Sequence, residues 1–197
     1  TEQTIISSGL SKWCGAGGWR LGTLIFPEEL SYIKDSIRKV VSETFTAVCA
    51  PVQYAAIIAY SEDHSAYLNN SRLILKTIAD YIYNELSSVG IKCQKSQGGF
   101  YMICDFSDSV KNTNEITNDK TLCNKILNDI GFAMLPGSDF GMEEEKLLSR
   151  IAFVDFDGSQ ALQLIEKGNF FPETFLQLSC PKILKGISKL KDWILTQ

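Results

Sequence analysis

One glycine-rich segment near the beginning constrains this chain more than any other feature. Between Gly9 and Gly22, small residues surround Lys12 and Arg20, and β-prone residues stand on both sides of the segment. Glycine lets the backbone approach a bound group closely. A desolvated lysine can attack a carbonyl and form a Schiff base, and an arginine grips a phosphate through two parallel contacts. The segment therefore indicates an anionic ligand held beside an amine, in a loop between two strands.

Two other interpretations of the segment explain less. Dinucleotide binding fails, because Arg20 stands where the pattern G-x-G-x-x-G needs its third glycine. The second alternative is a glycine-rich structural turn that carries a surface lysine and a surface arginine.

Composition narrows the class of protein. The chain has 197 residues, of which 45% are hydrophobic, and 19 basic against 23 acidic side chains give a net charge of −4. This weak acidity argues against a polycationic nucleic-acid binder and against a protein of anionic membranes. The apolar run over 55–60 is too short to cross a bilayer, and the polar start over 1–4 is no signal peptide. We expect a cytoplasmic protein with no nucleic-acid or membrane partner.

Cysteine and histidine usage limits the chemistry further. The six cysteines form no C-x-x-C pair, and His64 is the single histidine. We interpret the cysteines as free thiols of a reducing compartment and expect no metal site. Proton chemistry must then use lysine, tyrosine, cysteine or carboxylates.

Hydrophobic spacing and glycine or proline punctuation predict the elements. The expected strands cover residues 4–8, 21–26, 91–93, 100–106 and 151–155, with the second of them buried. The expected helices cover residues 27–44, a segment after Pro51, and residues 65–89, 122–130 and 183–194. Residues 107–119 are expected to form a loop. The lysine-rich helix over 183–194 is interpreted as docked on the protein rather than as lying on a membrane surface. Near residues 88–92 the pattern changes from helical spacing to strand-like segments, which indicates a domain boundary.

The segment from Gly9 to Gly22 resembles the pyridoxal-phosphate attachment site of class I/II aminotransferases at every constrained position. The resemblance implies that Lys12 carries the cofactor as a Schiff base and that Arg20 binds its phosphate. Ser11 precedes the lysine as in many members and would contribute to the cofactor site. Gly9 departs from the family, where many members have a serine that touches the phosphate. Ser8, one residue earlier, is the nearest hydroxyl that could bind it instead.

The resemblance continues downstream. Residues 98–101, Gly-Gly-Phe-Tyr, resemble the strand that opens the small domain of the family, and residues 135–141 resemble its proline-glycine loop. In Ser149-Arg150-Ile151, Arg150 matches the arginine that binds the substrate α-carboxylate. A guanidinium recognises a carboxylate through two contacts, and a strand holds it rigidly. The simpler interpretation is a surface arginine at the start of a strand.

The resemblance also implies the fold and its organisation. We expect an α/β chain in which residues 1–88 are the tail of the large pyridoxal-phosphate-binding domain. Residues 89–197 would form a small α+β domain of two or three strands with covering helices. Without partner strands, the first part should expose a sheet edge and apolar surface.

Several parts of the family's site have no counterpart in this sequence. These are the glycine-rich phosphate loop, the aromatic residue that stacks on the pyridine ring, the asparagine, and the aspartate that pairs with the ring nitrogen. The chain therefore looks like the C-terminal half of an aminotransferase, with little or no catalysis of its own. The parent enzyme would transfer an amino group between an amino acid and a 2-oxo acid, as a homodimer.

Two alternatives stay open. One is a lyase or synthase of the same fold, such as a C–S lyase or an enzyme like aminocyclopropane-carboxylate synthase. The other is a non-catalytic fragment or interaction module. The resemblance also bears on the substrate, because in aspartate-specific members of the family a basic residue just ahead of the helix after Pro51 grips the side-chain carboxylate. Residues 44–50 contain no basic side chain, which favours an uncharged or aromatic amino donor.

The remaining candidates have simpler interpretations. Tyr54 and Tyr101 could line the site, although core packing is commoner for tyrosine. Trp13 and Trp19 are expected to pack. The other expectations are a structural role for Cys14, a solvated loop for Glu143, Glu144 and Glu145, and an exposed helix start for His64.

Overall fold

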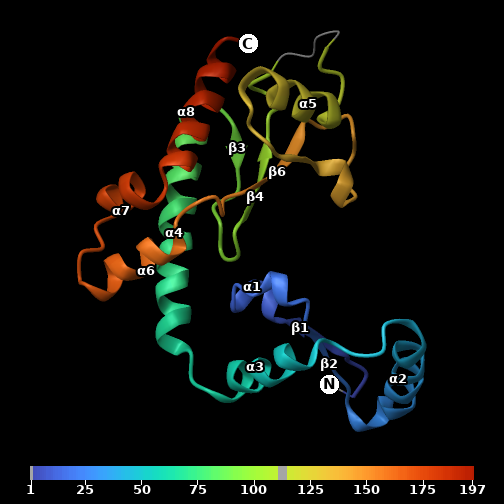
Figure 1. Cartoon of the computed structure of the whole chain (residues 1–197). Coiled ribbons are helices and arrows are strands. Elements are labelled where there is room, and N and C mark those ends of the chain that lie inside the picture. Colours follow the sequence, from blue (N-terminus) through green and yellow to red (C-terminus); the bar gives the residue numbers. More distant parts are fainter. Residues whose placement is uncertain (1, 111–114) are drawn as a thin grey trace. The chain divides into compact units, whose positions relative to one another are not determined.

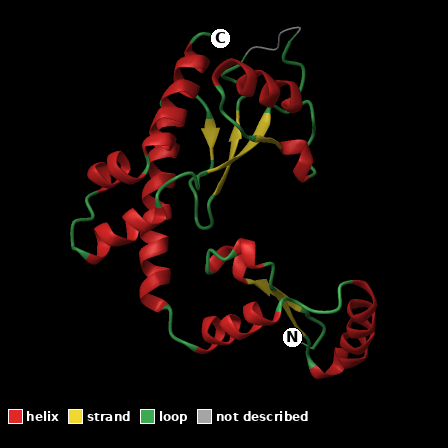
Figure 2. Ribbon diagram, viewed as in Figure 1, coloured by secondary structure: helices red, strands yellow, loops and turns green. Residues whose placement is uncertain are grey.

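The computed structural model describes residues 2–110 and 115–197 of the chain. These residues form two compact units, Thr1–Leu68 and Asn69–Gln197. The division between the units falls inside one long helix, α4 (Ser65–Ser87). The predicted domain boundary near residues 88–92 falls just after this helix. Figure 1 follows the chain by colour, and Figure 2 shows the helices and strands of each unit.

The first unit is built on a two-stranded antiparallel ribbon. Strand β1 (Ile6–Gly9) pairs with β2 (Gly22–Ile25). Between them lie the one-turn helix α1 (Leu10–Trp13) and the 3-10 turn η1 (Gly17–Trp19). After β2 come the 3-10 turn η2 (Glu28–Leu30) and the helices α2 (Ser31–Thr44) and α3 (Ala50–Ser61). The expected strand–loop–strand order and both helices are confirmed, and α2 ends at Thr44 as predicted.

The core of the first unit is small. Its fully packed side chains are Leu10, Leu21 and Ala56. Leu24 is 48% exposed and Ile25 57% exposed, so the prediction that the strand over 21–26 is buried was wrong except at Leu21. The reason is that a ribbon of two strands covers little of its own faces. Helix α2 buries no side chain, and the expected exposure of apolar surface in this part of the chain is confirmed.

The second unit contains a four-stranded sheet of order β3-β4-β6-β5, in which every neighbouring pair is antiparallel. The strands are β3 (Lys92–Cys93), β4 (Tyr101–Asp105), β5 (Leu135–Pro136) and β6 (Leu148–Ala152). Four strands replace the expected two or three, because β5 is too short to show an alternating pattern. The hairpin of β3 and β4 has the predicted glycines Gly98 and Gly99 in its loop.

Strand β6 lies three residues earlier than the sequence predicts. It was expected over 151–155 and runs over Leu148–Ala152, because its five residues pair with the five residues of β4. After Ala152 the chain leaves the sheet, and the Asp157 side chain accepts a hydrogen bond from the Gln160 backbone N–H and caps α6 (Gly158–Glu166). Helix α6 and the following helix α7 (Pro172–Ser179) were not predicted.

Helix α5 (Asp119–Ile130) confirms the prediction over 122–130. Asn118 and Thr121 form a capping box at its beginning, and Gly131 ends it in a left-handed conformation with φ 71°. Part of the expected loop over 107–119 falls on residues 111–114, which lie outside the described residues. The 3-10 turn η3 (Gly137–Phe140) follows β5.

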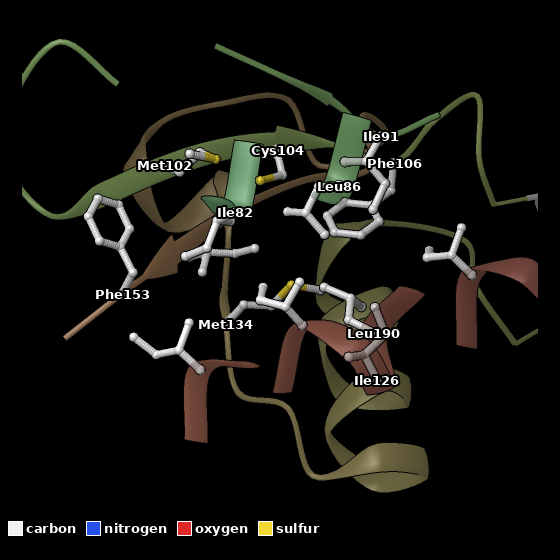
Figure 3. Close-up of a cluster of buried hydrophobic side chains, with 14 of the residues drawn as sticks. Ile82, Leu86, Ile91, Met102, Cys104, Phe106, Ile126, Met134, Phe153 and Leu190 are labelled. Atoms are coloured by element: carbon white, nitrogen blue, oxygen red, sulfur yellow. The ribbon is translucent and has the colours of Figure 1, made fainter. Parts of the chain in front are cut away.

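One face of the sheet packs on helices and forms the main core. From β4 it receives Met102 and Cys104, which lie against Ile82 and Leu86 of α4 (Figure 3). Helices α5 and α8 (Pro181–Leu195) complete this core with apolar residues such as Ile126 and Leu190.

Helix α8 is docked as predicted. Its buried residues are Ile183, Ile187, Leu190, Trp193 and Ile194. Its polar side is also fixed, because Lys191 forms an ion pair with Glu85 and Lys189 Nζ donates to the Ile130 carbonyl at 3.1 Å. In the described ranges, no helix combines the length and apolar character that a membrane crossing requires.

Candidate functional site

The lysine loop, residues 9–22, is closed at its base by the strand pair. Gly9 lies opposite Gly22, and Leu10 N–H donates to the Leu21 carbonyl at 3.4 Å. A Cβ at Gly9 would lie 3.3 Å from the Leu21 carbonyl oxygen, so a larger residue there would push the strands slightly apart. Within the loop, Ala16 N–H donates to the Leu10 carbonyl at 3.0 Å. Buried Leu10 thus anchors the loop at its base.

Lys12 occupies α1, two residues after this anchor. Its side chain is exposed, whereas the neighbouring Ser11 and Trp13 are half-buried. Ser11 lies beside Gly17, where an added Cβ would be 3.9 Å from the Ser11 Cβ. The loop therefore carries an exposed lysine in a compact turn of small residues.

Arg20 ends η1 in an unusual backbone conformation. Its φ is 52°, in the left-handed region that non-glycine residues rarely adopt. Its Nη1 donates to the Gly17 carbonyl at 3.0 Å, so the guanidinium lies along the loop that carries Lys12. A left-handed arginine costs of order 1–2 kcal/mol, and such strain clusters at ligand sites.

Ser8 belongs to β1 and is exposed. It pairs with Thr23, whose Oγ1 donates to the Ser8 carbonyl at 3.5 Å. The structure thus places the four predicted cofactor residues, Ser8, Ser11, Lys12 and Arg20, in or beside one loop.

An aromatic cluster supports this loop from α3 and the segment after it. The Trp13 ring lies 5.9 Å from the Tyr60 ring and 6.1 Å from the His64 ring, between centroids. Tyr60 Oη is 3.3 Å from Thr23 Oγ1, which ties the cluster to β2. His64 is half-buried, and its Nε2 is buried without a hydrogen-bond partner among the described residues, so the expectation of an exposed histidine was wrong.

The other candidate residues of this unit differ in how far they are buried. Trp13 packs as expected, but Trp19 is 43% exposed. Tyr54 is 74% exposed. Cys14 is half-buried against the Leu10 cluster, which agrees with a structural role.

Arg150 belongs to the second unit and lies in the middle of β6. It is opposite Ile103 of β4 and Leu135 of β5. The interpretation as a surface residue at a strand start is therefore wrong. The central carbon of its guanidinium lies 4.1 Å from the Tyr101 ring centroid and 3.9 Å from the Phe140 ring centroid. Two aromatic rings thus hold the guanidinium by cation–π contact.

Arg150 also keeps hydrogen-bonding capacity. Its Nε is buried and has no hydrogen-bond partner among the described residues. A buried donor of this kind calls for an acceptor that the protein itself does not supply. A planar carboxylate suits it, because the guanidinium can donate two parallel N–H bonds.

The turn η3 carries Phe140, which sequence reasoning did not single out. Gly137 permits the turn, because a Cβ there would lie 2.9 Å from the Leu148 Cβ and 3.2 Å from the Leu148 carbonyl. The fully buried carboxylate of Asp119 holds Ser138 in this turn. Its place in the proline-glycine loop over 135–141 was the one sequence feature that could have pointed to Phe140. Its contact with Arg150, ten residues later, is tertiary and leaves no periodic pattern in the sequence.

The acidic run after this turn is a solvated surface, as expected. Glu143, Glu144 and Glu145 are exposed, and the first two form ion pairs with Lys146 and Lys120. The described residues hold no group of three or more histidine, cysteine or acidic side chains that could bind a metal ion.

The fold is that of aspartate aminotransferase-like enzymes. A superposition on the aromatic aminotransferase of Pyrococcus horikoshii has a TM-score of 0.74 at 21% identity, over 99% of this chain and 44% of that one.

The sequence comparison gives the family. The profile described as "Aminotransferase class I and II" matches residues 1–166, so the chain belongs to this family. Pyridoxal phosphate is the cofactor that this family implies. A valine–pyruvate aminotransferase of Mycobacterium tuberculosis is 28% identical over 176 residues, or 87% of this chain and 42% of the relative. An aspartate aminotransferase of Bacillus sp. is 30% identical over 140 residues, or 71% of this chain and 34% of the relative. The chain thus spans about two fifths or less of the length of these relatives.

Proposed function

We propose that this chain supplies the lysine loop and the carboxylate-binding strand of a pyridoxal-phosphate-dependent aminotransferase. Residues 1–88 would be the tail of the large domain, and residues 89–197 the small domain. The observation that carries the proposal is the loop between Gly9 and Gly22, which holds an exposed lysine and a guanidinium in one turn. A purely structural turn would not need a left-handed arginine.

The residues present fit the cofactor. An exposed primary amine can bind its aldehyde carbon, and a guanidinium beside small residues can bind its phosphate. When bound, pyridoxal phosphate supplies an electron sink for the bonds at the substrate α-carbon. The hydroxyls of Ser8 and Ser11 are the further donors that this loop offers to the phosphate.

The residues would then take separate roles. Lys12 Nζ would hold the cofactor and would move the proton at the substrate α-carbon. Arg20 would hold the phosphate. Arg150 orients the substrate by binding its α-carboxylate, and Tyr101 and Phe140 fix the plane of that guanidinium.

The substrates follow from this chemistry. The proposed reaction transfers an amino group between an amino acid and a 2-oxo acid in a cytoplasmic homodimer. The amino donor is proposed to be uncharged or aromatic. A lyase or synthase of the same fold would use the same lysine and arginines. The product distinguishes these reactions in an enzyme of the relatives' full length that includes this chain. A 2-oxo acid product supports transamination. Pyruvate with a thiol, or a cyclised product, supports the lyase or the synthase.

A non-catalytic interaction module is the second candidate. It is favoured by exposed apolar side chains of the first unit, among them Leu24, Ile25, Ile57 and Ile58. Large apolar side chains exposed in number are typical of a surface that another protein covers. The two candidates differ in whether Lys12 binds the cofactor.

The first test is a titration of the chain with pyridoxal phosphate, followed by its visible absorption. We expect a band that depends on Lys12, is lost in Lys12→Ala, and shifts when amino acids are added. Lys39→Ala, which removes an exposed lysine of α2, is the matched control and should keep the band. A band of equal strength in Lys12→Ala would contradict the assignment of the lysine. Steady turnover by the chain alone would contradict the proposal that it needs the remaining part of the enzyme.

A further inference from the structure

Two cysteines face one another across the hairpin of β3 and β4. Cys93 and Cys104 are direct partners in the antiparallel register, and their Sγ atoms lie 3.2 Å apart. Directly opposed residues of antiparallel strands have Cα atoms about 4.5–5.5 Å apart. This spacing falls inside the range of about 4.4–6.8 Å that disulfides span. The backbone therefore already has the geometry of a bridge.

The two thiols differ in access. Cys104 is fully buried beside Met102 in the main core (Figure 3), whereas Cys93 is only half-buried. Their shared hydrogen bond lowers the pKa of Cys93, against the opposing effect of its burial. The same hydrogen bond, together with burial, raises the pKa of Cys104. A half-buried thiol with a lowered pKa thus stands beside a fully buried partner, which is the arrangement of a reactive and a resolving cysteine.

The other four cysteines do not share this arrangement. Cys123 and Cys180 are buried singly, Cys14 is half-buried in the lysine loop, and Cys49 is exposed. In the described part of the chain, Cys93 and Cys104 are the two thiols within hydrogen-bond distance of each other. The pair is also distinct from the proposed cofactor residues, which all belong to the first unit.

We propose that Cys93 and Cys104 form a reversible thiol–disulfide site that hydroperoxides oxidise. Cys93 thiolate attacks the O–O bond of the peroxide, forms a sulfenic acid and releases hydroxide. Cys104 then gives up its proton and attacks the Cys93 sulfur. The S–S bond forms, and the sulfenic oxygen leaves as water. The two thiols lose two electrons and two protons, and hydrogen peroxide is reduced to two molecules of water.

Oxidation would join β3 to β4 covalently and close a loop over residues 94–103. The same strand β4 carries Tyr101, whose ring holds Arg150. The bridge requires a sulfur–sulfur approach from 3.2 Å to about 2.05 Å, which a small change in side-chain torsion supplies. A dithiol of this geometry also chelates trivalent arsenic, which gives a second probe of the reduced site.

The test uses the whole reduced chain, treated with hydrogen peroxide, then unfolded in urea with iodoacetamide to block the remaining thiols, and digested without reduction. Trypsin cleaves after Lys92 and Lys95 and so separates Cys93 from Cys104. We expect a linked pair of peptides that contain these two cysteines, on a chain that stays monomeric in a non-reducing gel. A thiol reductant should restore both free thiols. Cys93→Ser should abolish the linked pair, and Cys49→Ser, the control at an exposed cysteine, should keep it.

The buried position of Cys104 means that its replacement could disturb folding, so Cys93→Ser is the main variant. A second measurement avoids mutation of the core altogether. Phenylarsine oxide should bind the reduced chain at one site, protect Cys93 from iodoacetamide, and lose this binding in Cys93→Ser. The proposal is overturned if the oxidised chain still alkylates fully at both cysteines. It is equally overturned if Cys93 links to a cysteine other than Cys104, or if the arsenical binds Cys93→Ser as tightly as the unchanged chain.

Discussion

The buried carboxylate of Asp119 accepts two hydrogen bonds from Ser138, one from its backbone N–H at 2.7 Å and one from its hydroxyl at 3.1 Å. Asp119 is the first residue of α5, and Ser138 lies in η3, two residues before Phe140. Since the Phe140 ring contacts the guanidinium of Arg150, this carboxylate holds the turn that positions the arginine. The proposed substrate site therefore depends on a residue that makes no contact with it.

Replacement of Asp119 by alanine should destabilise the second unit. It removes both acceptors and leaves the partly buried Ser138 N–H without its partner, which costs about 1–3 kcal/mol. The free energy of unfolding is measured by urea denaturation. Asp139→Ala, in the same turn but exposed, is the control and should change the free energy by less than about 0.5 kcal/mol. Equal effects of the two variants would contradict the positioning role of Asp119.

The contact between Arg150 and Tyr101 should appear as a coupling energy. A guanidinium over an aromatic ring at a partly exposed site contributes about 0.5–1 kcal/mol. In a double-mutant cycle of Arg150→Met and Tyr101→Leu, the double variant should therefore lose less unfolding free energy than the sum of the two single losses, by this amount. A second cycle with Tyr54→Leu, which removes an exposed ring of the other unit, should be additive. A zero coupling in the first cycle would show that the rings do not hold the arginine.

The sequence predicted best those elements whose ends are fixed locally. Gly131 ends α5 in a left-handed conformation, and Gly90 follows α4 with φ 86°, so both helix ends could be found from glycine alone. The lysine loop was predicted for the same reason, because its glycines are local signals. Helices α6 and α7 were missed because they have only 9 and 8 residues and their buried positions rest on tertiary packing.

The site around Arg150 shows where local reasoning stops. Its strand was placed three residues late, since β6 begins where its pairing with β4 begins, and a pairing partner leaves no mark on the strand itself. The same holds for Phe140 and Asp119, whose roles depend on contacts across the chain. Burial of the strand over 21–26 was overestimated because an apolar pattern states what can be buried and does not show what covers it.

The isolated buried thiols should resist alkylation. Burial raises the pKa of Cys123 to about 12 and that of Cys180 to about 12, with nearby Asp119 and Asp139 adding to the shift at Cys123. At pH 8, only about one in ten thousand of such thiols is ionised, and the thiolate is the reacting form. In the native chain, iodoacetamide should modify exposed Cys49 and leave Cys123 and Cys180 intact, as followed by peptide mass spectrometry. Modification of all three at similar rates would contradict the packing of α5 and α8. In urea the difference should disappear.

The stability of the second unit should fall in acid partly through Asp129. Its carboxylate accepts a hydrogen bond from the Trp193 indole N–H at 2.8 Å and pairs with Lys125, and these contacts lower its pKa below the usual 3.8. A carboxyl with a depressed folded pKa stabilises the fold above its unfolded pKa, and the contribution disappears as the pH falls through the folded pKa. We therefore expect the free energy of unfolding to decrease below about pH 5, and Asp129→Asn to flatten this decrease. Trp193→Phe should flatten it partly, since it removes the donor with the largest effect on the carboxyl. In the Asp129→Asn background, Trp193→Phe should instead cost the same free energy at pH 4 and at pH 7, measured by urea denaturation at both values. An unchanged acid slope in Asp129→Asn would mean that the bond between α5 and α8 does not contribute to the pH dependence.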